Sequence, residues 1–113
     1  PGCGIGIYVE ADTAVTGNVV DGAALAGLWL GWGPYLRNVT ATGNVIRSAP
    51  TGIAVSVVDG VGSVVISANV ISEAERGAII GMRWAEAGTG DLAQGETPPP
   101  GLVVIGNQAG TRQ

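Results

Sequence analysis

The sequence contains no histidine, no lysine and no phenylalanine, and it has a single cysteine. Without histidine or lysine there is no imidazole base or imidazole metal ligand, no serine–histidine triad and no Schiff-base amine. The one cysteine, Cys3, excludes an intramolecular disulfide and a zinc site built from clustered cysteines. We therefore expect no catalytic residue, no cofactor and no metal site within this segment.

Charged residues are also scarce, at 12% of the chain, and the formal net charge is −4. An acidic balance is unfavourable for binding to nucleic acid or to an anionic membrane surface. No apolar run approaches the ~18 residues that a membrane-spanning helix needs. These features predict that neither nucleic acid nor a membrane is a partner.

Glycine and hydrophobic residues, in contrast, are abundant: there are 20 glycines, and 46% of the chain is hydrophobic. A chain this apolar folds around a core, and its 113 residues suit one domain, so we assign residues 1–113 to a single domain. The chain opens with Pro1-Gly2-Cys3, without a methionine or an apolar leader. This opening predicts a piece of a longer protein whose targeting signals lie upstream.

The sequence repeats itself about every 25 residues. Three apolar runs begin 25 residues apart, at Gly27, Gly52 and Gly77, and a fourth begins 23 residues before the first of these, at Gly4. Each copy also carries a marker asparagine, at intervals of 26, 25 and 38 residues: Asn18, Asn44, Asn69 and Asn107. The long last interval contains glycine- and proline-rich stretches, which predict a projecting loop over residues 83–101.

Within each copy, apolar residues alternate with small or polar ones, which is typical of strands with one buried face. Three short strands per copy, stacked copy on copy, predict an all-β parallel β-helix, a solenoid of about four coils of ~25 residues. The alternation assigns these residues to one core: Ile5, Ile7, Leu28, Leu30, Ile53, Val55, Val64, Ile66, Ile71 and Ile80.

The recurring asparagines are expected to have a structural role. In a stack, equivalent side chains lie one strand spacing (~4.8 Å) apart, so the amide of one asparagine reaches the next. We predict a hydrogen-bonded ladder at one corner, formed by Asn18, Asn44, Asn69 and Asn107. An asparagine at a turn tolerates the left-handed backbone conformation, and the glycine or alanine before it keeps the corner narrow.

Repeats of the form Gly-Ile-x-Val followed by Val-x-Ile-x-x-Asn-x-Ile resemble the right-handed parallel β-helix of the pectate-lyase-like group over almost the whole chain. The resemblance implies the fold but no single activity, since lyases, hydrolases, epimerases, tailspikes and adhesins share it. More narrowly, the pattern is similar to an uncharacterised bacterial family of twin-arginine-translocated repeat proteins. That similarity implies a C-terminal portion of an exported protein in a periplasmic or extracellular location.

Enzymes of the pectate-lyase-like group place acidic and basic residues on the outer side of the first strand of each coil. In this chain, only Glu10 and Arg83 are charged among the outward positions of that strand, and they lie three coils apart. A complete site for cleaving acidic polysaccharides is therefore not expected here. A polysaccharide-active enzyme (lyase, hydrolase or epimerase) whose catalytic coils lie upstream is the alternative hypothesis.

The aromatic residues mostly fall on or beside the first strand of each coil, and aromatic faces suit sugar rings. The candidate carbohydrate-binding residues are Tyr8, Trp29, Arg83 and Trp84, with the arginine available for a carboxylate or sulfate. A competing interpretation packs Trp32 in an inward column with Met82, and Trp29 and Trp84 under the projecting loop.

The leading hypothesis is a structural or carbohydrate-associated module of unknown activity, with a polysaccharide as partner. A β-helix cut between coils exposes unpaired backbone groups and apolar side chains at its ends. We therefore also expect either a homo-oligomer through the exposed coil ends or upstream coils of the same parent chain.

Overall fold

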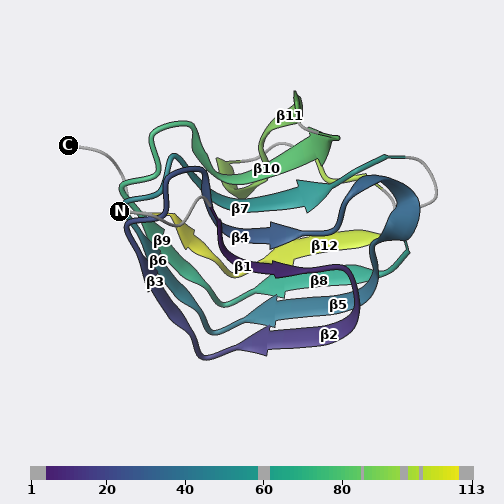
Figure 1. Ribbon diagram of the computed structural model, residues 1–113, viewed down its shortest axis with the longest axis horizontal. Helices are drawn as coiled ribbons and strands as arrows, with labels where there is room; N and C mark the ends of the chain where they lie inside the picture. The colour runs from purple at the N-terminus through teal and green to yellow at the C-terminus, as the bar shows by residue number, and fades with distance from the viewer. Residues whose placement is uncertain (1–4, 59–61, 85, 95–96, 100, 110–113) are drawn as a thin grey trace.

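The computed structural model of the chain describes residues 5–58, 62–84, 86–94, 97–99 and 101–109 (Figure 1). Its regular structure consists of β-strands and two short 3-10 helices, η1 (Gly33–Tyr35) and η2 (Leu92–Gln94). Sheet A contains β1 (Ile5–Val9), β4 (Ala26–Leu30), β7 (Thr51–Ser56), β10 (Gly77–Arg83) and β11 (Glu86–Asp91). Sheet B contains β2 (Ala11–Thr16), β5 (Arg37–Thr42), β8 (Val64–Ser67) and β12 (Leu102–Ile105). Sheet C contains β3 (Val19–Asp21), β6 (Val45–Arg47), β9 (Val70–Ser72) and β13 (Gln108–Ala109).

The chain visits sheets A, B and C in turn four times, and we call each passage one circuit. With the exception of β11, each strand pairs in parallel with the equivalent strand of the next circuit, so the circuits lie one on another (Figure 1). The all-β prediction is confirmed, and the strands form parallel stacks.

The main core lies between the three sheets, where equivalent apolar residues stack in columns. On sheet A, Leu28 pairs with Ile53, which pairs with Ile79, and all three are fully buried. Sheet B contributes columns that contain Val39 and Ile66, which are 1% and 0% exposed. Because equivalent apolar side chains of successive circuits stack on one another, each circuit buries the apolar side chains of its neighbour. A single circuit could not bury them alone.

The repeated glycines leave room for the side chains of sheet C. A Cβ atom on Gly27 would lie 2.4 Å from Cγ2 of Ile46, and one on Gly52 would lie 2.5 Å from Cγ2 of Ile71. Because both isoleucines are buried in the main core, a larger residue at either glycine position would displace them. This packing explains why glycine recurs at the start of the sheet A strands.

The fourth circuit departs from the predicted register by one residue. Gly77 lies opposite Thr51 rather than Gly52, and Ile79 therefore lies opposite Ile53 and faces the main core. The inward positions predicted for Ile80 and Met82 are wrong, since both side chains pack on the other face of sheet A. Ile5, also predicted in the main core, packs on that other face as well.

The segment predicted as a projecting loop, residues 83–101, contains the strand β11, which turns back antiparallel along β10 (Figure 1). Polar side chains make part of this pairing. The Asp91 carboxylate accepts hydrogen bonds from the backbone N–H groups of Ala78 and Ile79, at 2.8 and 3.0 Å. Thr89 Oγ1 accepts from the Gly81 N–H at 2.9 Å. The interpretation of residues 87–91 as loop is therefore wrong, because these side chains anchor a glycine-rich strand.

Candidate functional site

The outer face of sheet A carries a second hydrophobic cluster, separate from the main core. Trp29 alternates with the inward-facing Leu28 and Leu30, and so it lies on this outer face. The buried members of this outer cluster are Ala26, Trp29, Ala54, Ile80 and Met82, and Ile5 and Trp32 pack against them. The outer side of sheet A therefore buries apolar side chains that are separate from the main core.

Three tryptophans run from this cluster to the surface. The ring centroids of Trp29 and Trp32 lie 6.2 Å apart, and those of Trp32 and Trp84 lie 5.6 Å apart in an edge-to-face arrangement. Trp29 is only 9% exposed, whereas Trp84 is 47% exposed. The predicted inward column containing Trp32 is wrong, because this ring packs with the outer cluster.

Trp84 is held in an unusual backbone conformation at the turn between β10 and β11. Its φ angle is +58°, in the left-handed region that a bulky residue rarely adopts. Its ring packs over Gly33, where a Cβ atom would lie 2.4 Å from Cη2. The Ser56 hydroxyl donates to the Gly33 carbonyl at 2.6 Å, which anchors the segment under the ring. The Trp84 ring is thus fixed in place while nearly half of its surface is exposed.

Tyr8 lies directly opposite Trp29 on the neighbouring strand and extends the aromatic face. Its side chain is exposed, and its hydroxyl donates to Glu10 Oε2 at 2.7 Å. Partial burial, with the hydrogen bond and the charge of Glu10, raises the pKa of Tyr8 to about 12. The phenol therefore stays protonated at neutral pH and keeps the Glu10 carboxylate in place beside the aromatic rings.

Arg83 is exposed at the end of β10 and pairs across the hairpin with Glu86. Its stem lies along Gly88, with Cγ 2.8 Å from where a Cβ atom of that glycine would be. Since Met82 faces the outer cluster, strand alternation directs Arg83 to the other side. The structure thus brings Tyr8, Trp29 and Trp84 to one face and leaves Arg83 off it.

Sequence reasoning assigned no site role to Trp32, which links Trp29 to Trp84. The signal that marks it is Gly31, whose φ angle of +82° interrupts the strand alternation. Tyr35, 63% exposed in η1, follows closely in sequence. In the sequence, the glycine between Trp29 and Trp32 was therefore the feature that could have indicated a break in the strand alternation.

The four recurring asparagines form a hydrogen-bonded ladder at the corner between sheets B and C. The backbone N–H and Nδ2 of Asn44 both donate to Asn69 Oδ1 at 2.9 Å, and the same pair of groups on Asn69 donates to Asn107 Oδ1 at 3.0 and 2.8 Å. Asn18 donates likewise to Asn44 Oδ1, at 3.0 and 3.2 Å. Asn44 Nδ2 also donates to the Val15 carbonyl at 3.0 Å. The donors and acceptors of the buried asparagine amides therefore already have hydrogen-bond partners within the protein, and none is left to bind a ligand.

The left-handed residue at this corner is the one before each asparagine. The φ angles are +67° at Gly43 and +56° at Ala68. The tolerance of asparagine for this conformation is therefore not what turns the chain at this corner. The preceding residue turns the chain, so the asparagine side chain is free to point inward and join the ladder.

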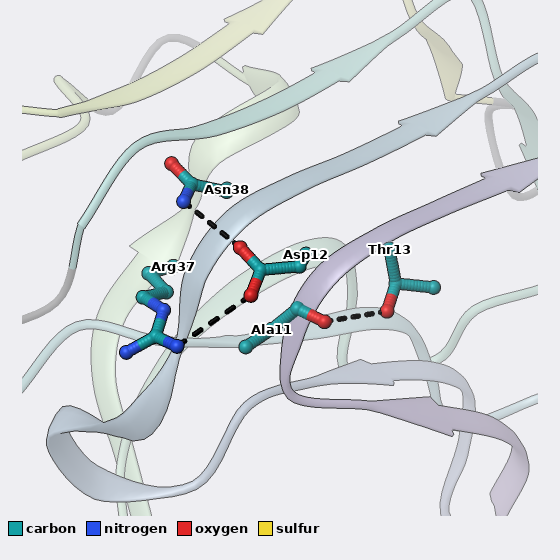
Figure 2. A network of polar contacts seen from close by, with 5 residues as sticks. All are labelled: Ala11, Asp12, Thr13, Arg37 and Asn38. Atoms are coloured by element: carbon teal, nitrogen blue, oxygen red, sulfur yellow. Dashed lines mark hydrogen bonds and ion pairs between the residues drawn. The ribbon is translucent and has the colours of Figure 1, made fainter.

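A second polar corner lies between sheets A and B (Figure 2). Asn38 Nδ2 donates to Asp12 Oδ1 at 2.9 Å, and Arg37 approaches Asp12 Oδ2 at 3.5 Å. The hydrogen bond from Asn38 is the largest cause that holds the pKa of Asp12 below its usual value; desolvation opposes it, and the charge and hydrogen bond of Arg37 add to the lowering. These side chains are exposed, and they join two circuits at the surface.

Within the described part of the chain, no three Cys, Asp or Glu side chains gather closely enough to share a metal ion. No helix among those residues is long and apolar enough to cross a membrane. The search against family models, curated proteins and solved structures finds no match to this chain.

Proposed function

We propose that the chain is part of a right-handed parallel β-helix of the pectate-lyase-like type, belonging to an exported bacterial protein. Support comes from the repeated passage through three sheets, the parallel pairing of equivalent strands and the ladder at a shared corner. In this proposal the stack is a rigid support for the face that it presents outside sheet A.

The function that we propose for this face is carbohydrate binding. The observation that carries the proposal is the fixed, half-exposed ring of Trp84, which packs edge-to-face on Trp32, and Trp32 in turn packs against Trp29. Aromatic rings present large apolar surfaces to the C–H faces of sugars. A ring already held by Gly33 loses little conformational freedom when a sugar binds, and this lowers the cost of binding.

The charges around the face favour neutral sugars. Glu10 beside Tyr8 offers carboxylate oxygens to sugar hydroxyl groups, whereas Arg83 is directed away from the face. A carboxylated or sulfated polymer would meet Glu10 and the net charge of −4 without a basic partner on the face. We therefore propose neutral polysaccharides as ligands, with Tyr8, Trp32 and Trp84 as the contacting residues.

Affinity electrophoresis and calorimetry test this function directly, with a soluble neutral β-glucan, xylan and polygalacturonate as probes. We expect a neutral polymer to retard the protein and Trp84→Ala to weaken its binding at least about fivefold. Val19→Ala, at an exposed position on sheet C, is the matched control and should leave the affinity unchanged. Absence of binding to every probe, or equal binding by Trp84→Ala, would overturn the proposal.

The alternative, a polysaccharide-active enzyme with its catalytic coils upstream, finds no specific support among the described residues. Glu10 is hydrogen-bonded to Tyr8, whereas hydrolysis of glycosidic bonds uses a pair of carboxyl groups. The binding module is therefore the function that we favour.

A further inference from the structure

The two ends of the stack differ in how they are covered. At the fourth circuit, η2 places Leu92 into the main core beside Leu102, with 5% of Leu92 exposed. Asp91 holds this turn by accepting a hydrogen bond from the Ala93 N–H at 3.0 Å. The helix η2 therefore caps part of the C-terminal end of the stack, where Val104 and Ala109 are still partly exposed.

At the first circuit, several inward residues of the columns are only half-buried, although Val15 is 4% exposed. Ile7 and Val20 are partly exposed, whereas their partners in the second circuit, Leu28 and Ile46, are 0% and 1% exposed. A hollow of about 360 Å³ opens beside them, lined by Gly6, Ile7 and residues 18–23. Among the described residues, apolar side chains of the core are therefore partly uncovered at this end.

The asparagine ladder has a direction, and its open end points the same way. Each rung donates toward the fourth circuit, so the Oδ1 atoms of Asn44 and Asn69 each accept two hydrogen bonds. Asn18 Oδ1 accepts none from the part of the chain that the structure describes, and Asn18 also lines the hollow. The first circuit thus presents an acceptor where every later rung already has its donors.

We propose that the exposed edge of β1, β2 and β3 docks one further circuit of polypeptide that runs in the same direction. Its corner amide donates to Asn18 Oδ1, and its inward apolar side chains fill the hollow. A second copy fits this edge less well, because a copy docked face to face presents the same acceptor end of the ladder. Head-to-tail stacking of copies would require η2 to leave the other end.

A chain extended by one circuit tests this inference. Residues 26–50 lead directly into Thr51, and Thr51 and Ile5 are both register partners of Ala26. A copy of residues 26–50 placed directly before Ile5, in place of residues 1–4, therefore supplies the missing circuit in register. We expect the melting temperature to rise by about 5 °C or more, and the amides of β1 and β3 to exchange more slowly.

The matched control is the same extended chain with leucine in place of the copied Asn44, which should lose part of the gain. An unchanged melting temperature with rapid exchange throughout the copied segment would overturn the inference. So would sedimentation of the unextended chain as a dimer that protects β1 and β3, since this would identify a second copy as the occupant.

If the extended chain does not fold, the synthetic peptide of residues 26–50 replaces it. Chemical-shift changes confined to β1–β3 would then support the inference, and their absence would contradict it.

Discussion

At the scale of single residues, the buried asparagines show why one polar residue type recurs inside an apolar stack. Asn44 and Asn69 are fully buried, yet their donors and acceptors are all satisfied. A buried amide is costly unless every polar atom has a partner, and the ladder provides these partners from the neighbouring circuits. The sequence predicted this ladder because its spacing matches the repeat, whereas the position of the left-handed residue was not predictable from a preference of asparagine for turns.

Removal of one buried rung should be strongly destabilising. Asn44→Ala leaves the Asn18 N–H and Nδ2 without their acceptor and opens a cavity, and we expect a loss of about 2–4 kcal/mol in the free energy of unfolding. Asn18→Ala removes a part-buried rung and should cost about 1 kcal/mol. Urea denaturation measures both. Equal losses for the two variants would show that the ladder does not carry this energy.

The hydroxyl of Tyr8 gives a prediction about pH. Its pKa is raised in the folded state to about 12, so its contribution to stability is present below pH 10 and is lost as the pH rises through the folded value. In a Tyr35→Phe background, where Tyr8 is the single tyrosine, ultraviolet titration should show a midpoint near 12 while circular dichroism reports the folded state. Glu10→Gln should lower this midpoint. A midpoint near 10 in the folded Tyr35→Phe protein would contradict the hydrogen bond between Tyr8 and Glu10.

At the scale of elements, the corners and the strand register show which parts of a repeat can be predicted. The period of two and the spacing of glycines predicted the inward residues of the second and third circuits, because equivalent residues stack directly. The same spacing failed in the fourth circuit, where Ala78 occupies the column of Gly27 and Gly52 and β11 pairs along the strand. For the site, Trp32 was assigned to the wrong face because Gly31 breaks the alternation.

The corner before the third asparagine is the one in this column without a glycine. Ala68 has a φ angle of +56°, and Gly43 occupies the equivalent place in the second circuit. Relief of this strain, offset by the greater freedom of glycine in the unfolded chain, should make Ala68→Gly stabilising by about 0.5–1 kcal/mol. Gly43→Ala, where a Cβ atom meets only Gly17 N at 3.9 Å, should be destabilising by about 1–2 kcal/mol. Thermal unfolding of both variants checks the pair, and a shift of the same sign in both would refute the assignment.

At the scale of the whole molecule, the stack combines a capped end, an open end and one aromatic side. The repeat in the sequence predicted the stack, but it did not predict the cap, because Leu92 is a single apolar residue in a segment of loop-like composition. The aromatic face likewise depends on residues from β1, β4, η1 and the β10–β11 turn, which the stacking of circuits brings together. Both the cap and the face therefore rest on the order of the circuits.

Disulfide trapping between circuits tests this order most directly. Thr16 and Thr42 are register partners on β2 and β5, and their hydroxyl oxygens lie 3.5 Å apart. With Cys3 replaced by serine, the pair Thr16→Cys and Thr42→Cys should form an intramolecular disulfide under mild oxidation, detected by mass spectrometry, and so should Thr42→Cys with Ser67→Cys. Thr16→Cys with Ser67→Cys spans two strand spacings, about 9–10 Å, and should not. A disulfide in that third pair would contradict the stacked parallel circuits. Failure of both adjacent pairs to form a disulfide would contradict them as well.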